Sequence, residues 1–292
     1  MTTPTSAGDL LETIVAATRH AVDVRRHATP QAQLEAQITR KPAGHAFIEA
    51  LRMSPAPRII AECKRRSPSR GILRASYDPA AHASAYAKAR AAAISVLTEP
   101  TFFDGALDHL AQVRSAVDLP LLRKDFIVTE YQLVESVVFG ADAVLLIVGA
   151  LDDKGRADRL RQGYGGPPKL HAKAEGQRYA CLRTLIEQAS ALGLAPLVEV
   201  HDRVELDRAV EAGATVLGVN SRNLRTLTVD RAVHEHLIAE MPAGVTAVAE
   251  SGIRTTADLD RLSTLGYHAF LVGERLIAEP DPGAALSELR RV

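Results

Sequence analysis

The sequence predicts an α/β fold in which eight strand–helix units close into a (β/α)8 TIM barrel. Short, almost continuously apolar runs alternate along the chain with segments of helical spacing, a pattern typical of parallel strands covered on both faces by helices. Eight such units favour a closed barrel over an open sheet, which usually has fewer strands. The 292 residues suffice for one such domain, since α/β barrels commonly run to about 250 residues.

Two helices are expected before the first strand. From Asp9 to about Arg26, apolar residues such as Leu10, Ile14 and Val22 recur at helical spacing, which indicates an amphipathic helix. A second, short helix is expected from Gly44 to Arg52. Because both precede the repeated strand–helix units, they form an N-terminal helical extension to the barrel.

The eight expected strands are short apolar runs, and each is followed by a helical stretch. In chain order the runs are RIIAE (58–62), AISVLTE (93–99), PLLRK (120–124), AVLLIV (143–148), APLVEV (195–200), TVLGVN (215–220), TAVAE (246–250) and AFLVG (269–273). Segments such as DPAAHASAYAKARA, TEYQLVESVVFGA and RVELDRAVEAGA supply the helices. This repetition of strand and helix predicts a parallel sheet.

One segment between the fourth and fifth strands breaks this rhythm. LDDKGRADRLRQGYGGPPKLHAKAEGQR (151–178) contains a Gly- and Pro-rich run at 163–168 that prevents a continuous helix, and its Lys and Arg outnumber its Asp and Glu. Its place after the carboxyl end of a strand would suit an active-site lid or a phosphate-attracting loop. A tolerated surface insertion is the simpler interpretation, and we favour it.

The balance of charge excludes broad electrostatic attraction to polyanions. Lys and Arg together number 35, as do Asp and Glu, so neither nucleic acid nor an anionic membrane is an expected partner. Any anion must therefore bind at a local site.

The cysteines and the N-terminal segment suggest a reduced, cytoplasmic setting. Cys63 and Cys181 lie far apart in the sequence, which suggests neither a disulfide framework nor a zinc site. Residues 1–20 include Asp9 and Glu12 and lack a basic start followed by an apolar core, so they do not resemble a secretory signal. No apolar run approaches the roughly 18 residues of a membrane span.

Polar side chains gather where the expected strands end. In a barrel the carboxyl ends of the strands converge on one mouth, where active sites are built. The groups expected there are Glu62, Lys64, Lys124, Asp125, Glu199, Asn220, Arg222, Glu250 and Ser251. Because side chains alternate along a strand, Glu62 and Lys64 should face the mouth together, whereas Cys63 should pack toward the helices.

Two glycine-containing loops suggest a phosphate site. Ser251-Gly252 and Gly273-Glu274 each stand between a strand and a helix, after the seventh and eighth strands. Glycine lets the backbone approach an anion, and the free N–H groups at a helix start point toward it. These loops are the common phosphate site of such barrels.

The histidines give no sign of a metal site. His234 and His236 are two residues apart and lie on different sides of a helix, and no His or carboxylate spacing indicates a metal. We expect both to be surface residues and the site to hold no metal.

Several motifs, in their order along the chain, resemble those of one enzyme family. The motifs are IIAECKRRSPSRG, LLRKDFIV, ADAVLLIV, PLVEV, GVNSRNLRTL, VAESGI and FLVGERL. Together they resemble indole-3-glycerol-phosphate synthase of tryptophan biosynthesis. The resemblance covers about residues 10–290 apart from segment 151–178.

The resemblance implies a phosphate-binding barrel with extra N-terminal helices over the mouth. We therefore expect residues 1–57 to form those helices and residues 58–292 to form the barrel. It also implies that 1-(2-carboxyphenylamino)-1-deoxyribulose 5-phosphate becomes indole-3-glycerol phosphate, with release of carbon dioxide and water and no cofactor. The expected partner is this small phosphorylated substrate, and the sequence says nothing about contact with other enzymes of the pathway.

By resemblance, two lysines and a carboxylate perform the chemistry. Lys124 is chiefly the general acid, Lys64 binds the substrate carboxylate and assists ring closure, and Glu199 is used in dehydration. Glu62 would hold both lysines. A lysine pKa near 10.4 would have to be lowered for proton exchange near neutrality. Which lysine delivers the first proton is left open.

The resemblance also implies substrate-binding residues. Asn220 and Glu250 would bind substrate hydroxyl or amine groups, and the planar fork of Arg222 suits the anthranilate carboxylate. Leu145 and Phe126 would form apolar walls for the aromatic ring.

For the phosphate, the resemblance implies Ser67 and the two glycine-containing loops, Ser251-Gly252 and Gly273-Glu274. Glu274 stands where some relatives carry serine, which implies contact through its backbone N–H rather than its side chain.

Two other functions compete with this interpretation. Phosphoribosylanthranilate isomerase is a related barrel that uses a cysteine at the end of the first strand and an aspartate at the end of the fifth. Cys63 is nominally available, but its predicted orientation and the glutamate at 199 argue against that reaction. A catalytically silent barrel that binds a protein is the second alternative, and the full set of charged groups at the mouth argues against it.

Overall fold

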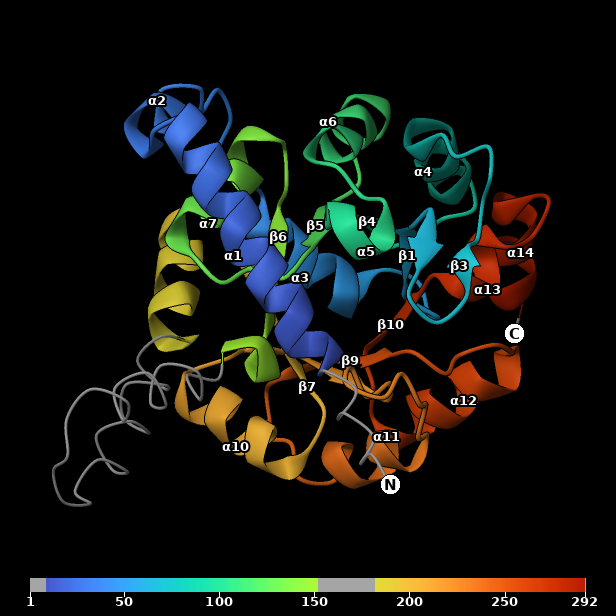
Figure 1. Cartoon of the computed structure of the whole chain (residues 1–292). Coiled ribbons are helices and arrows are strands. Elements are labelled where there is room, and N and C mark those ends of the chain that lie inside the picture. Colours follow the sequence, from blue (N-terminus) through green and yellow to red (C-terminus); the bar gives the residue numbers. More distant parts are fainter. Residues whose placement is uncertain (1–8, 152–181, 292) are drawn as a thin grey trace, which may run out of the picture.

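Eight parallel strands close into a barrel (Figure 1). The structure is a computed structural model that describes residues 9–151 and 182–291. The strands are β1 (Ile59–Cys63), β4 (Ala93–Leu97), β5 (Leu121–Lys124), β6 (Ala143–Ile147), β7 (Ala195–Val200), β8 (Val216–Asn220), β9 (Thr246–Glu250) and β10 (Ala269–Val272). Since β1 pairs in parallel with both β4 and β10, the barrel is closed. The predicted (β/α)8 TIM barrel is confirmed.

Helices that follow the strands form the outer layer of the barrel. They are α4 (Pro79–Lys88), α6 (Leu107–Ala116), α7 (Glu130–Val138), a helix over 182–191, α10 (Arg203–Glu211), α11 (Ala232–Ile238), α12 (Thr256–Leu265) and α14 (Pro282–Leu289). Side chains cap several of them at the N-terminus, namely Asp78, Asp202, Thr255 and Asp281. Within the described residues, no helix is long and apolar enough to cross a membrane.

Short elements extend the strand ends at the mouth. The loop after β1 forms a hairpin of β2 (Arg66–Ser67) and β3 (Gly71–Ile72). The other short elements are α5 (Pro100–Phe103) after β4, the 3₁₀ helix η1 (Val148–Leu151) after β6 and α13 (Glu274–Ile277) after β10. None of these was predicted from the sequence as a separate element, because each is too short to show periodicity.

The strands divide their side chains between two cores. On β1, Ile59, Ala61 and Cys63 belong to the core between sheet and helices, whereas Ile60 belongs to the core inside the barrel. This alternation follows from the period of two along a strand. The predicted outward orientation of Cys63 is confirmed, and its side chain is fully buried.

Helix α1 (Leu10–Ala28) lies across the mouth of the barrel. It packs against α5 and η1, which follow the carboxyl ends of β4 and β6. Leu11 and Ile14 are buried there in the inner core cluster, and Asp9 caps the helix through a 3.1 Å hydrogen bond from the Leu11 N–H. The short helix α2 (Gln31–Glu35), which the sequence analysis did not predict, then packs on α7.

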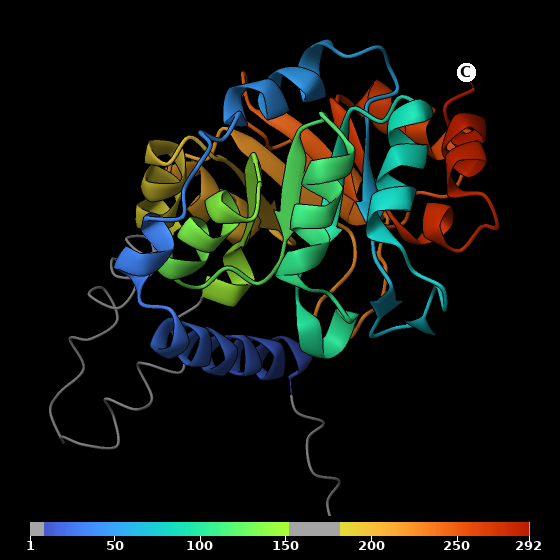
Figure 2. The ribbon, with the colours of Figure 1, turned by 90° about the horizontal axis from the view of Figure 1, so that it is seen from above.

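Helix α3 (Gly44–Met53) lies at the opposite end of the barrel, as Figure 2 shows. The Gly44 N–H donates to the Gly193 carbonyl at 3.0 Å, just before β7 begins. A side chain at Gly44 would meet the Ala195 nitrogen at 2.6 Å, so glycine permits this close approach. Phe47 and Leu51 fill the amino end of the inner core.

The expectation that both N-terminal helices cover the mouth is therefore wrong for α3. The amphipathic pattern identified a helix with one apolar face, but it could not say which end of the barrel that face would cover. The division into residues 1–57 and 58–292 stays a prediction. Phe47 and Leu51 belong to the N-terminal part of that division, yet they pack in the core inside the barrel.

His234 is buried rather than at the surface, which corrects our expectation. Its side chain is 1% exposed, its Nε2 lies 3.0 Å from the Glu250 carbonyl oxygen, and its ring meets Tyr267 edge to face. Since His234 and Leu237 are three residues apart, they share the face of α11 that packs against the barrel. His236 is exposed, as expected.

The Gly- and Pro-rich segment 151–178 lies outside the described residues except for Leu151, which ends η1. Its interpretation as a tolerated insertion or as a lid stays a prediction.

Candidate active site at the barrel mouth

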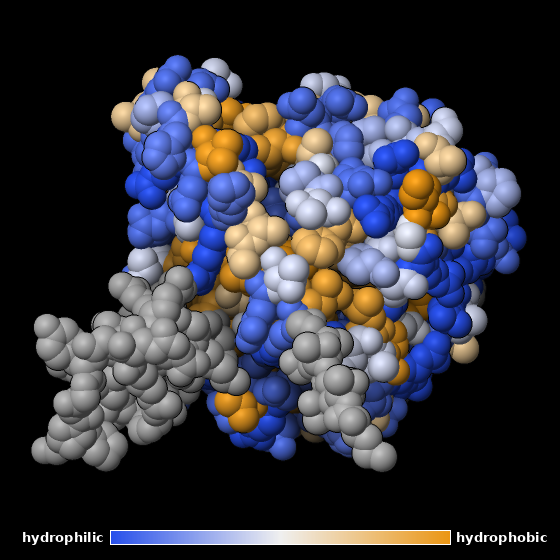
Figure 3. All heavy atoms as spheres, in the orientation of Figure 1, coloured by the Kyte–Doolittle hydropathy of each residue, from blue (hydrophilic) through white to orange (hydrophobic). Residues whose placement is uncertain are grey.

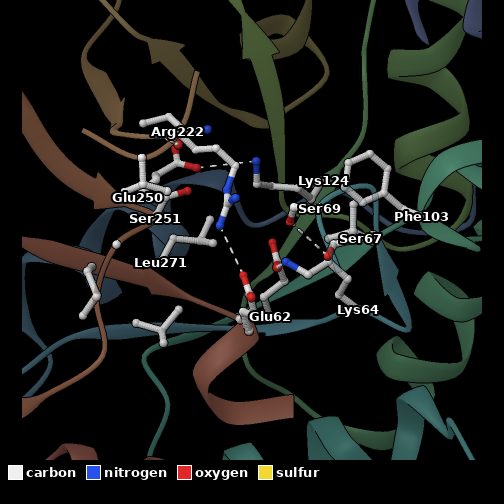
Figure 4. Close-up of a pocket in the computed structure, with 18 of the residues that line it drawn as sticks. Glu62, Lys64, Ser67, Ser69, Phe103, Lys124, Arg222, Glu250, Ser251 and Leu271 are labelled. Atoms are coloured by element: carbon white, nitrogen blue, oxygen red, sulfur yellow. Dashed lines mark hydrogen bonds and ion pairs between the residues drawn. The ribbon is translucent and has the colours of Figure 1, made fainter. Parts of the chain in front are cut away.

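A cavity of about 610 Å³ opens at the carboxyl ends of the strands (Figure 4). Every position that was assigned to the site from the sequence lines it, namely Glu62, Lys64, Ser67, Lys124, Asp125, Phe126, Leu145, Glu199, Asn220, Arg222, Glu250, Ser251, Gly252, Gly273 and Glu274. These positions come from seven different strand ends. They share one cavity, whereas their individual roles stay predictions.

Lys124 is the centre of a buried cluster of charges. Its Nζ lies 3.0 Å from Glu199 Oε2 and 3.5 Å from Glu250 Oε2. Asn220 Nδ2 donates to the other oxygen of Glu199 at 3.1 Å, which fixes the orientation of that carboxylate. Both glutamates are almost fully buried, so their attraction to Lys124 is weakly screened by water.

The surroundings of these groups set their protonation. Burial alone would lower the pKa of Lys124, but the charges of Glu199, Glu250 and Glu62 outweigh burial and raise it. For Glu199, burial is outweighed by Lys124, His201 and Asn220, which hold its pKa well below its usual range. The lower lysine pKa that ready proton exchange near neutrality would require is therefore not found at Lys124, because carboxylates rather than cations face it.

Glu250 is the carboxyl group that titrates near neutrality. Burial, and then the charges of Glu199 and Glu62, raise its pKa to about 8 against the opposing effect of Lys124. Neither of its oxygens has a hydrogen-bond partner among the described residues. A side chain at Gly218 on β8 would overlap Glu250 Oε1, so this glycine makes room for the carboxyl group. Glu250 therefore keeps its proton to a higher pH than an ordinary glutamate, beside the Lys124 ammonium.

Lys64 forms a separate ion pair with Glu62 at the same mouth. Both side chains are largely buried. A side chain at Gly273 would overlap the Glu62 carboxylate, so this position accommodates Glu62 as well as contributing backbone to the cavity. We had expected Glu62 to hold both lysines. Among the described residues it pairs with Lys64 alone, because Glu199 and Glu250 are the carboxyl groups that lie within 4 Å of Lys124.

Arginines and Glu274 meet at the rim of the cavity. Arg222 lies 3.2 Å from Glu274 Oε2, and Arg70 pairs with the other oxygen of the same carboxylate. The side chain of Glu274 is thus paired with two arginines, and its predicted contact with phosphate through the backbone N–H stays a prediction. Ser251 and Gly252 have φ of 64° and 71°, so their backbone turns in the left-handed region, as a tight glycine loop requires.

One side of the cavity is apolar. Leu145 and Phe126 are buried in its wall, and the Phe103 ring of α5 lies 6.3 Å from the Phe126 ring between centroids. In the orientation of Figure 1, apolar side chains appear near the middle of the visible surface and in several separate places toward its edges (Figure 3). Such a wall suits a flat aromatic group.

His201, Arg70 and Phe103 lie at or beside the site but were not predicted from the sequence. His201 Nε2 lies 3.3 Å from Glu199 Oε1. It stands two positions after Glu199, so the alternation that we applied to Glu62 and Lys64 would have found it. Arg70 and Phe103 lie on the β2–β3 hairpin and α5, and their approach to the cavity depends on how those short elements fold.

The fold and this site together define a class of protein. The mouth of this (β/α)8 barrel holds two lysines and three buried glutamates beside glycine loops and an apolar wall. These groups are typical of an enzyme that performs acid–base chemistry. The sequence matches the model of the family described as "Indole-3-glycerol phosphate synthase" over residues 11–162 and 176–289. The chain belongs to this family, whose members are carbon–carbon lyases of tryptophan biosynthesis.

Curated relatives agree with this assignment. An indole-3-glycerol phosphate synthase of Parafrankia sp. (strain EAN1pec) is 44% identical over 279 residues, which cover 96% of this chain and 94% of that protein. Indole-3-glycerol phosphate synthase 1 of Streptomyces coelicolor is 48% identical over 232 residues, which cover 80% and 77%. The enzyme of Sulfurimonas denitrificans is 46% identical, with 80% and 79% covered.

Solved structures with distant sequences share the fold. Thiamine phosphate pyrophosphorylase from Pyrococcus furiosus superposes with a TM-score of 0.54 at 15% identity and covers 84% of this chain and 96% of its own. N-acetylmannosamine-6-phosphate 2-epimerase from Clostridium perfringens superposes with a TM-score of 0.53 at 13% identity, and the match covers 78% of this chain and 90% of that one. At these identities the likeness concerns the barrel architecture alone.

Proposed function

We propose that this chain converts 1-(2-carboxyphenylamino)-1-deoxyribulose 5-phosphate into indole-3-glycerol phosphate, carbon dioxide and water, with Lys124, Glu199 and Glu250 as the central groups. The observation that carries the proposal is the Lys124 ammonium between these two carboxyl groups, in a cavity that also holds Lys64 and an apolar wall. Membership of the family supports the same reaction.

Ring closure is the first stage. The ring carbon that bears the carboxylate attacks the ribulose carbonyl, a carbon–carbon bond forms, and the carbonyl oxygen takes a proton from Lys124. Glu199 and Glu250 lie close enough to Lys124 Nζ to take part in returning that proton. The bond to the carboxylate then breaks, carbon dioxide leaves, and the bonding electrons restore the aromatic ring.

Dehydration is the second stage, and it needs an acid and a base. The departing hydroxyl must gain a proton to leave as water, while the intermediate gives up another proton. Glu199 is ionised and held in place, so it suits the role of base. Glu250 is protonated near neutrality and its oxygens have no hydrogen-bond partner among the described residues, so it suits a substrate hydroxyl or amine.

Cationic groups and backbone N–H groups would hold the two anionic ends of the substrate. Lys64 and Arg222 suit the anthranilate carboxylate, and Arg222 would then exchange Glu274 for the ligand. Ser67 and the N–H groups of Gly252 and Glu274 suit the phosphate, since glycine at 252 keeps the backbone accessible. No cofactor takes part in the proposed reaction.

The geometry disfavours the isomerase alternative. Cys63 is fully buried against α4, and burial raises its thiol pKa far above the usual range. A group so placed cannot exchange protons with a ligand in the cavity. The silent-barrel alternative predicts no turnover, so the experiment below separates it from the proposal.

Purified protein incubated with the carboxyphenylamino-deoxyribulose phosphate should produce indole fluorescence, and added EDTA should not stop it. Lys124→Ala and Glu199→Gln should each lower kcat by at least ~100-fold, because each removes a proton-transfer group. Lys88→Ala, which changes an exposed lysine on α4, should retain full activity. Circular dichroism would check that each variant is folded.

Full activity in both site variants would refute the mechanism. No turnover by the parent protein would instead favour the silent barrel. We further propose a cytoplasmic location, on the basis of the two widely separated cysteines. We propose neither nucleic acid nor membrane as a partner, on the basis of the balanced charge.

A further inference from the structure

His201 connects Glu199 of the site to a second carboxylate on α10. Its Nε2 lies 3.3 Å from Glu199 Oε1, and its Nδ1 lies 3.0 Å from Glu205 Oε2. The backbone N–H of His201 also donates to Glu205 Oε2, at 2.8 Å. A continuous row of charged groups, Glu205, His201, Glu199 and Lys124, therefore runs from the outer helix into the cavity.

The surrounding fold holds this row in place. Asp202 accepts a 2.8 Å hydrogen bond from the Glu205 N–H, which fixes the first turn of α10. On η1, a side chain at Gly149 would meet Glu205 Oε1 at 2.7 Å, so glycine makes room for that carboxylate. The side chains of His201 and Glu205 are 15% and 16% exposed, so the pair is largely protected from solvent.

The charges around His201 favour its protonated form. Burial alone would lower the pKa of the imidazole, but Glu199 and Glu205 outweigh burial and raise it to about 10. Among the described residues, the charged groups around the ring are Glu199 on β7, Glu205 on α10 and, beyond Glu199, Lys124 on β5. The neighbouring η1 has no titratable side chain. His201 is therefore a cation that lies between the two carboxylates at neutral pH.

We infer that His201 is a positioning residue that holds Glu199 in its reactive orientation. Asn220 donates a hydrogen bond to Glu199 Oε1, and the His201 Nε2 lies 3.3 Å from the same oxygen, so that Oε2 faces Lys124 and the cavity. His201 also remains as a cation beside Glu199 when Lys124 gives its proton to the substrate, so the buried carboxylate is never left unpaired. Where catalysis is concerned, this inference rests on the proposed function and deepens it.

The activity test uses His201→Gln, which keeps a hydrogen-bond donor but removes the charge. We expect kcat to fall ~10-fold, because Glu199 loses part of its orientation, and KM to change less than about twofold. The acidic limb of the kcat–pH profile should move to higher pH, because loss of a neighbouring cation raises the pKa of Glu199. Glu205→Gln should shift the limb in the same direction by less.

The control is His45→Gln. His45 and Glu49 are also four residues apart on a helix, but their side chains are 93% and 62% exposed and 3.8 Å apart. This variant should match the parent in kcat and in pH profile. A loss of stability alone, without movement of the acidic limb, would give His201 a merely structural role and overturn the inference.

A second measurement is independent of turnover. NMR of the ligand-free parent protein should show the His201 imidazole still protonated at pH 8, and Glu205→Gln should lower its pKa. If the parent lacked turnover, which would contradict the proposed function, this titration would still test the pairing. An imidazole pKa near the ordinary 6.5, or a folded His201→Gln variant with unchanged kcat and profile, would overturn the inference. If His201→Gln does not fold, the test rests on Glu205→Gln, and an unchanged pH profile together with an unchanged His201 pKa in that variant would overturn the inference.

Discussion

Two glycines in the barrel make room for carboxyl groups of the site. Gly218 lies against Glu250, and Gly273 lies against Glu62; a methyl group at either position would overlap the carboxyl oxygen. Neither glycine has positive φ, so backbone conformation does not require them. Glycine is needed at both positions for its small size, because it leaves space for the carboxyl groups of Glu62 and Glu250 inside a closely packed barrel.

Gly218→Ala should therefore act through Glu250. We expect it to destabilise the protein by ~1–3 kcal/mol, because the methyl group forces the buried carboxyl out of its place. In a Glu250→Ala background the same substitution should lower the free energy of unfolding much less, because the overlapping oxygen is gone. Urea unfolding of the parent, the two single variants and the double variant would measure this coupling. An equal cost in both backgrounds would mean that Gly218 serves the strand rather than Glu250.

At the scale of elements, two helices close the two ends of the barrel and serve different purposes. Helix α1 covers the mouth beside η1 and α5, and α3 seals the amino ends of the strands. Both bury apolar side chains in the same inner core cluster, which runs the length of the barrel. We therefore expect substitutions in both to reduce stability, but only those in α1 to disturb the reaction.

Phe47→Ala and Leu11→Ala test this difference. Phe47 is fully buried and Leu11 is 4% exposed, so both changes leave cavities and should cost ~2–5 kcal/mol. Folded Phe47→Ala should keep kcat/KM within about twofold of the parent. Leu11→Ala should lower kcat/KM by more, because α1 loses its anchor over the mouth. Thermal unfolding and steady-state kinetics below the Tm of each variant would give both quantities; a larger kinetic defect in Phe47→Ala would contradict the assignment.

For the whole molecule, a buried carboxyl group near neutrality makes stability depend on pH. The pKa of Glu250 is about 8 in the folded protein, against an ordinary value of 4.5, so between these values the folded state binds more protons than the unfolded one. Its contribution to stability is therefore fully present below about pH 4.5 and is lost as pH rises through about 8.

Glu250→Gln should remove this dependence, because the amide stays neutral throughout. As pH is raised from about 5 to about 9, the Tm of the parent should fall relative to that of the variant. Differential scanning calorimetry of the two proteins at matched pH would measure the difference. A constant difference in Tm would mean that Glu250 titrates at an ordinary pKa in the folded protein.

The sequence was informative wherever a local pattern suffices. The eight strands follow from apolar runs, and the orientation of Glu62, Lys64 and Cys63 follows from alternation. The charged and polar residues of the cavity follow from the rule that carboxyl ends of strands converge, whereas Ser67, Phe126 and Leu145 were assigned by resemblance to the family. His234 and α3 were misplaced, because periodicity defines which face of a helix is apolar but not what that face meets.

By itself, the sequence determined the closed barrel, the family and the set of residues at the mouth, because these depend on the spacing of apolar runs and on motifs in their order along the chain. Only the tertiary structure decided which charges meet. It pairs Lys64 with Glu62, and Lys124 with Glu199 and Glu250, and it adds His201 behind Glu199. The physical reason is that protonation depends on distances of a few ångströms between side chains from different strands, and those distances are fixed only when the barrel closes.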